Sequence, residues 1–212
     1  MRWPAFLNIK TIGLLLTGGI AGAAFILVLI EFDHATSTEA FCTSCHSMEI
    51  VAEPYRQSVH YNPTSGVRAS CGDCHVSRGV ISATWDHILG TKDLFKQLFG
   101  ADYDNPVVNL VHAPDAAFKA REWFRKTDSD TCLRCHVLEG IKGTRADTQK
   151  VHQEESEGKS CIDCHINLVH RKVPGKKVFK RDAWNRMVEE EFGLQEGMAE
   201  KIRQGLVKAP QP

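Results

Sequence analysis

Cys42-Thr43-Ser44-Cys45-His46 is the first of four CxxCH motifs that decide the fold of this chain of 212 residues. The others are Cys71-Gly72-Asp73-Cys74-His75, Cys132-Leu133-Arg134-Cys135-His136 and Cys161-Ile162-Asp163-Cys164-His165. The two thiols of such a motif add across the two vinyl groups of one haem, and the adjacent histidine reaches the iron as an axial ligand. The sequence therefore predicts four covalently bound haems c. Their cofactor-binding residues are Cys42, Cys45, Cys71, Cys74, Cys132, Cys135, Cys161 and Cys164, and their proximal ligands are His46, His75, His136 and His165.

Two other cysteine chemistries explain the motifs less well. Paired CxxC motifs also have the spacing of a zinc ribbon, and eight cysteines suit a disulfide framework. Neither requires a histidine directly after every second cysteine, whereas all four motifs have one. Because all eight cysteines of the chain lie in the motifs, none is left for another kind of site.

The composition limits the fold and the partners. The 26 basic and 26 acidic residues give a formal net charge of zero, which does not indicate nucleic-acid binding. Aromatic residues are only 8% of the chain, so four flat apolar porphyrins are expected to supply much of the buried surface. We expect a mainly α fold, with one transmembrane helix before a small haem-cored multihaem cytochrome c domain.

An uncharged stretch of 20 residues, Thr11 to Ile30, predicts a membrane span. A cleaved signal peptide is the alternative, but the apolar run exceeds the usual length. Arg2 and Lys10 precede the stretch, whereas acidic residues follow it, so the N-terminus is expected in the cytoplasm and the haems outside the plasma membrane. Within the span, Gly18 and Gly22 form a GxxxG motif that permits a homo-oligomer.

An internal duplication divides the haem region into two dihaem repeats. Cys42 precedes Cys71 by the same 29 residues that separate Cys132 from Cys161. Each half also carries a histidine between its motifs, His60 and His152. Because these two are repeat-equivalent, we expect both to be distal haem ligands. The other candidates for distal ligands are His170, which lies too close to His165 to serve the same haem, and His112; His34 is expected to be a solvated linker residue.

The first motif differs from its repeat partner at one position. Met48 lies two residues after His46, where the second half has Leu138. The Met48 thioether can replace His46 as the axial ligand, or it can simply pack there, which leaves the other face of the first haem open to a substrate.

Between the halves, residues 81–99 have the apolar periodicity of an amphipathic helix, which can lie at the membrane interface or pack on the haems. Asp93 borders its apolar face. His87 lies about 120° from Asp93 on an ideal helix, so the two can line one pocket only if the helix is irregular.

We expect three segments: a membrane anchor at 1–32, a tetrahaem domain at 33–172 and a charged, amphipathic C-terminal extension at 173–212. In the extension, apolar residues at four-residue spacing predict two short helices interrupted at Gly193. The extension can dock on the haem domain or on a partner, or it can be a partly disordered tail.

Together, these residues resemble the NapC/NirT/NrfH family of membrane-anchored tetrahaem cytochromes c. The resemblance covers about Thr11 to Arg171 and includes the anchor, the four motifs, the extension of the first motif to Met48, the stretch Ser58-Val59-His60-Tyr61-Asn62 and the last motif with His170. By this resemblance, Met48 looks like the ligand of the haem nearest the quinol, and Asp93 looks like the acidic residue over its open face. The sequence departs from the family at His87, near the expected lysine, and at Arg78, where a histidine is often found.

The resemblance implies a quinol dehydrogenase in the bacterial inner membrane, with Asp93, His87 and Met48 at its catalytic site. It is expected to take electrons from the quinone pool and pass them to a periplasmic multihaem or molybdenum oxidoreductase. One alternative is the reverse flow, from a periplasmic oxidase of hydroxylamine-type compounds to quinone. A passive electron carrier tethered to the bilayer is another.

Overall fold

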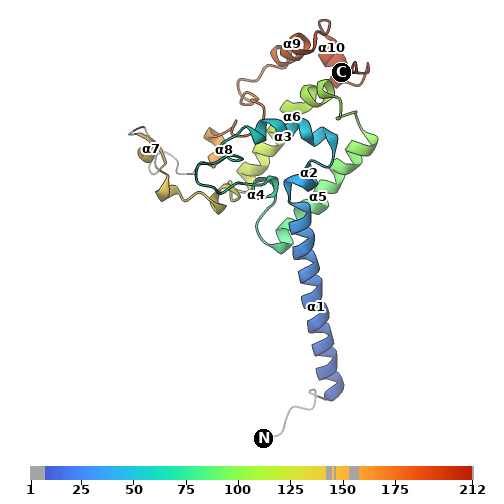
Figure 1. The fold of residues 1–212 in the computed structure, drawn as a ribbon, viewed down its shortest axis with the longest axis vertical. Coiled ribbons are helices and arrows are strands. Elements are labelled where there is room, and N and C mark those ends of the chain that lie inside the picture. Colours follow the sequence, from blue (N-terminus) through green and yellow to red (C-terminus); the bar gives the residue numbers. More distant parts are fainter. Residues whose placement is uncertain (1–7, 142–144, 146, 153–157, 212) are drawn as a thin grey trace.

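The computed structural model describes residues 8–141, 145, 147–152 and 158–211, and this part of the chain is helical, with no strand (Figure 1). The mainly α fold is therefore confirmed. After the long helix α1 (Ile9–Thr36), the larger helices are α3 (His46–Arg56), α5 (Val80–Phe99), α6 (Pro106–Lys126), α9 (Arg181–Phe192) and α10 (Met198–Arg203). The short helical segments are α2 (Glu39–Cys42), α4 (Cys71–His75), η1 (Cys132–Arg134), η2 (Leu138–Gly140), α7 (Asp147–Lys150) and α8 (Cys161–Cys164).

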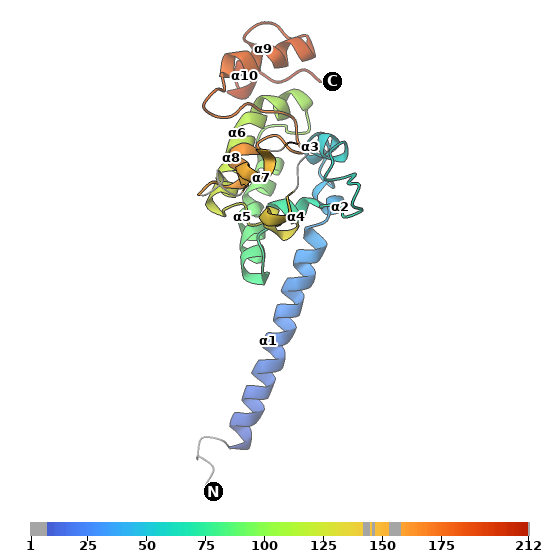
Figure 2. The same cartoon turned by 90° about the vertical axis from the view of Figure 1, so that its left-hand side faces the viewer.

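Helix α1 projects from the domain as a single stem (Figures 1 and 2). Asn8 caps its start by accepting a hydrogen bond from the Thr11 amide at 2.9 Å, and none of its 28 residues is buried. At about 1.5 Å per residue the helix is about 42 Å long, more than the roughly 30 Å hydrocarbon core of a bilayer. By length and composition α1 can cross a membrane. Arg2, on which part of the predicted orientation rests, lies outside the described residues.

The two halves repeat one local design at their second motifs. Ser70 and Asp73 form a capping box at the start of α4, and Ser160 and Asp163 form the same box at the start of α8. In such a box the serine hydroxyl and the carboxylate bind each other's backbone amides, which stabilises a first turn. Each box orders the turn that holds both cysteines of its motif.

The first cysteines of paired motifs also meet in the same way in both halves. The thiols of Cys42 and Cys71 lie close enough to shift each other's pKa, and Cys161 lies close enough to raise the pKa of Cys132. The internal duplication predicted from the 29-residue spacing is therefore repeated in three dimensions. Each half brings the attachment points of two haems together.

The largest apolar core lies where the C-terminal extension packs on α6, at the end of the domain away from α1 (Figure 1). The two predicted helices are present as α9 and α10, and Gly193 ends α9 in the left-handed region at φ 61°. The extension thus docks on the haem domain, which was one of the three alternatives. The buried residues of this core are Val107, Val108, Leu110, Val111, Val173, Trp184, Val188, Ala199 and Ile202.

Asn105 anchors both the start of α6 and the end of the extension. Its Oδ1 accepts hydrogen bonds from the amides of Val107 at 2.9 Å and Val108 at 3.4 Å, and its Nδ2 donates to Pro210 O at 2.8 Å. We expect Asn105→Ala to lower the free energy of unfolding by about 1–2 kcal/mol, because a helix cap is lost. Urea unfolding in detergent, followed by circular dichroism, measures this. The exposed Gln57→Ala is the control, and equal stability of the Asn105 and Gln57 variants would contradict the prediction.

Candidate haem and electron-transfer site

Three of the four motif histidines each face a histidine from outside the motifs. The ring centroids are 6.2 Å apart for His136 and His60, 6.0 Å apart for His75 and His170, and 6.2 Å apart for His165 and His152. The three non-motif partners are the residues that the sequence predicts as distal ligands. Two of the pairs join different halves of the chain, since His60 faces the third motif and His170 faces the second.

The spacing of these pairs suits two axial ligands of one iron. Imidazole nitrogens bind metals at about 2 Å, so two rings on opposite sides of an iron have centroids about 6 Å apart. Aromatic rings in direct contact have similar separations. Ordinary packing does not explain, however, why each pair joins one motif histidine to one predicted distal ligand. The residues present therefore fit three haems with two histidine ligands each.

Backbone carbonyls orient two of the non-motif histidines in these pairs. Nδ1 of His170 donates to Val51 O at 3.1 Å, and Nδ1 of His152 donates to Thr148 O at 2.7 Å. Because a carbonyl can only accept, each Nδ1 carries the proton and each Nε2 keeps its lone pair for a metal. Nδ1 of His60 is buried and has no hydrogen-bond partner in the described part of the chain.

Desolvation favours the neutral form of three of these rings, the form that metal ligation requires. It lowers the pKa of His75 to about 4, with a smaller contribution from His170. It also lowers the pKa of His170 and, together with the charge of His136, that of His60.

The first motif has no such histidine pair among the described residues. His46 and Met48 lie in the first turn of α3, and both are exposed. At 100° per residue they project about 200° apart, so only one of them can bind a given iron face. The buried Ser47 lies between them, and its carbonyl accepts a hydrogen bond from Asn109 of α6 at 3.0 Å. The structure thus sets the first motif apart, as Met48 in the sequence suggests.

His87 lies at the junction of α5 with the end of α1, near enough to Cys42 of the first motif to lower the pKa of that thiol. Its Nδ1 donates to Ala83 O at 2.8 Å, and its Nε2 lies 2.8 Å from the hydroxyl of Thr36. The Asp33 carboxylate is 3.8 Å from Nδ1. In the sequence, Asp33 is only one of the acidic residues that follow the apolar stretch. Asp33 lies in the last turn of α1, and α5 packs against this end of α1, which brings Asp33 near His87.

Asp93 lies further along α5 and does not share this junction. Its side chain is 65% exposed and forms an ion pair with Lys96 at 2.6 Å. Because α5 is uninterrupted from Val80 to Phe99, the helical angle keeps Asp93 and His87 on different faces. The structure therefore does not bring the two residues into one pocket.

His112 is the remaining candidate ligand, and it lies on α6. Its ring is 5.5 Å from that of Tyr103, and no motif histidine pairs with it among the described residues. Desolvation lowers its pKa, and the nearby Arg203 and Arg181 of the extension act in the same direction, although Asp115 opposes them.

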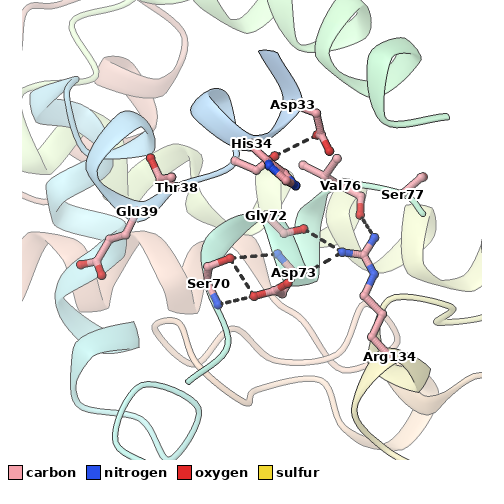
Figure 3. A pocket seen from close by; sticks show the side chains of 11 residues that line it. Asp33, His34, Thr38, Glu39, Ser70, Gly72, Asp73, Val76, Ser77 and Arg134 are labelled. Atoms are coloured by element: carbon pink, nitrogen blue, oxygen red, sulfur yellow. Dashed lines mark hydrogen bonds and ion pairs between the residues drawn. The ribbon is translucent and has the colours of Figure 1, made fainter. Parts of the chain in front are cut away.

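A polar cavity of about 420 Å³ lies where α1, α2 and α4 meet (Figure 3). Figure 3 shows Arg134 of the third motif reaching into the second motif, where it donates to the carbonyls of Gly72 at 3.4 Å and of Val76. Gly72 is needed here, because an added Cβ would lie 2.5 Å from Ser37. Arg134 thus links a motif of the second half to one of the first.

Comparisons with known proteins show which family the chain resembles. The model of the NapC/NirT cytochrome c family, N-terminal region, matches residues 6–175. A probable tetraheme cytochrome c-type protein of Nitrosomonas europaea is 38% identical over 77% of this chain and 71% of its own length. NapC of Escherichia coli K12 is 35% identical over 80% of the chain and 86% of its own length.

The chain matches less than half of some longer relatives. TorC of Escherichia coli K12 is 32% identical over 76% of this chain but 42% of its own length. No solved structure matches significantly. The family match covers most of the chain, including all four motifs. The chain therefore belongs to the NapC/NirT family and is a tetrahaem cytochrome c that transfers electrons through covalently bound haems.

Proposed function

We propose that this cytochrome oxidises membrane quinol beside its first motif and passes the electrons to a periplasmic redox protein. The observation that carries the proposal is the position of His87. It joins α5 to the end of the only described helix that can cross a membrane, and it is near enough to Cys42 to lower the pKa of that thiol. A quinol headgroup at the membrane surface would therefore meet the first motif before any other.

The first motif also has the ligand chemistry that a substrate site needs. The other three motif histidines face a second histidine, whereas His46 and Met48 have no such partner in the described residues. We propose Met48 as the ligand of this haem, which leaves its opposite face accessible. The haems supply one-electron chemistry when bound, so two electrons from quinol leave one at a time.

His87 can take up a proton at Nε2. Its Nδ1 is protonated because it donates to a carbonyl, so the neutral ring keeps a lone pair at Nε2, which lies 2.8 Å from the Thr36 hydroxyl. Asp33 at 3.8 Å would stabilise the imidazolium that follows. We propose this pair as the first proton acceptor. Asp93, given a role by the family resemblance, would be a later acceptor further along α5.

An apolar face of α5 can keep the quinol-binding region at the membrane surface. Seven large apolar side chains of the helix are more than half exposed, and five of them share one stripe: Ile81, Trp85, Ile88, Phe95 and Phe99. Such a surface suits lipid or the isoprenoid tail of a quinone. We propose that the N-terminus is cytoplasmic and that the haem domain lies in the periplasm.

We expect His87→Gln to slow haem reduction by quinol at least tenfold, because general-base assistance typically contributes 10²–10⁴-fold. Asp33→Asn is expected to slow it less, since that residue acts through His87. Initial rates of haem reduction by a soluble menaquinol analogue measure both effects. Reduction by dithionite and the haem content should stay unchanged.

Asp182→Asn is the matched control, because this exposed carboxylate lies on α9, at the opposite end of the molecule from α1 (Figure 1). Unchanged quinol rates in His87→Gln and Asp33→Asn would contradict the proposed junction site. If Asp93→Asn alone is slow, the site lies further along α5. If only prereduced protein reacts, giving electrons to quinone, the flow is reversed.

A further inference from the structure

Arg121 is a buried cation that holds a length of backbone instead of an acidic partner. It lies on α6 and is 6% exposed. Its guanidinium donates to Val173 O at 2.7 Å, to Ile166 O and Pro174 O at 3.1 Å each, and to Asn167 Oδ1 at 3.2 Å. No salt bridge to a carboxylate is found among the described residues. Its hydrogen bonds are therefore all directed at residues 166–174, directly after the fourth motif.

The 166–174 segment has little order of its own. No helix lies in this segment. Among the described residues, no backbone-to-backbone hydrogen bond has its donor or acceptor in it. One internal side-chain bond joins Asn167 Oδ1 to the Val173 amide at 3.0 Å, and that same oxygen accepts from Arg121. Arg121 makes four hydrogen bonds to this segment, more than any other described residue, and therefore contributes most to its shape.

His170 lies in the middle of the segment that Arg121 holds. Ile166 and Asn167 precede it, and Val173 and Pro174 follow it, so one guanidinium closes the loop at both ends. At the tip of this loop the His170 ring stands 6.0 Å from that of His75.

The C-terminal extension supports the same loop from outside. Arg171 forms an ion pair with Glu191 of α9, with its Nη1 2.9 Å from Oε1, and its Nη2 lies 3.2 Å from the Met187 sulfur. Val173 is 2% exposed in the core that α6 shares with Trp184. The extension, which continues beyond the family match at residue 175, therefore supports the part of the loop that follows His170.

We propose that Arg121 is a positioning residue that holds His170 against the haem of the second motif, with the C-terminal extension as its outer support. This inference rests on the proposed pairing of His75 with His170. Without the guanidinium, several carbonyls lose their donor and the loop no longer has a defined shape. His170 then leaves the iron, although all four haems stay attached, because the thioether bonds do not involve the loop.

Arg121→Gln tests the inference in the full-length, haem-loaded protein. Electron paramagnetic resonance should show one low-spin haem converted to a high-spin haem, and the reduced protein should bind one more carbon monoxide per chain. Added imidazole should restore the low-spin signal, because a displaced ligand can be replaced whereas an unfolded domain cannot. Arg121→Lys keeps the charge but lacks the planar fork, so it should convert a smaller fraction.

Lys119→Gln removes an exposed cation from the same helix and should leave the spectrum unchanged. His170→Ala is the reference: if it leaves all low-spin haems intact, the proposed pairing fails. If His170→Ala converts one haem and Arg121→Gln converts none, the pairing stands and the role of Arg121 is wrong. If Arg121→Gln does not accumulate, Arg121→Lys and Asn167→Ala decide the matter, and unchanged spectra in both would overturn the inference.

Discussion

Replacing His60, His152 or His170 by alanine is expected to convert one low-spin haem to high spin in each variant. The centroid of each ring lies about as far from that of one motif histidine as two ligands of one iron require. The cysteines still hold the haem, so the count of four haems should not change. Electron paramagnetic resonance and carbon monoxide titration measure the effect, and each variant should bind one more carbon monoxide than the parent protein.

Two further histidines serve as controls for that experiment. His34 lines the polar cavity at the end of α1, and His112 lies against Tyr103. Neither faces a motif histidine, so His34→Ala and His112→Ala should leave the low-spin count unchanged. Conversion of a haem in His112→Ala would give His112 back the ligand role considered from the sequence. Unchanged spectra in the three distal variants would contradict the pairing.

Trp184→Ala is expected to lower the free energy of unfolding by about 3–5 kcal/mol, as for other large buried aromatic residues. Trp184 is 6% exposed in the core between α6 and α9, and its Nε1 donates to Leu110 O at 3.0 Å. The substitution therefore leaves both a cavity and a buried carbonyl without its donor. Urea unfolding in detergent, followed by helical circular dichroism, measures the change.

Trp85→Ala is the matched control, because Trp85 is 58% exposed on α5 and contributes little to the core. Equal midpoints for the two tryptophan variants would contradict the structure of this core. The same core also affects any search for a redox partner by truncation, because the extension contributes to the stability of the domain. Removing the chain from Lys176 would expose the apolar face of α6, so lost co-purification would report unfolding as readily as a missing docking surface.

The features that the sequence predicts correctly are encoded locally. A CxxCH motif places both thiols and the ligand within five residues, and the span from Thr11 to Ile30 is recognised by length and composition alone. The duplication was visible because the 29-residue spacing is repeated. The capping boxes at Ser70 and Ser160 now show the physical unit that was duplicated.

The features that the sequence does not determine depend on tertiary contacts. Which proposed distal histidine faces which motif follows from how the halves pack, and His60 and His170 both face a motif of the other half. Arg121 has no periodic or motif signature, because its partners are backbone carbonyls of a loop 45 to 53 residues away. The sequence leaves open whether the extension docks on the haem domain, docks on a partner or is disordered. The packing of α9 and α10 on α6 shows that it docks on the haem domain.

The most direct test of quinol oxidation at the first motif is rapid mixing of the oxidised protein with a menaquinol or ubiquinol analogue. Haem absorbance is followed with and without a quinone-site inhibitor. We expect fast reduction of the parent protein that the inhibitor blocks. Reduction of the His87→Gln variant should be at least tenfold slower without any inhibitor. Reduction of all four haems by dithionite but of none by quinol would contradict the proposed function.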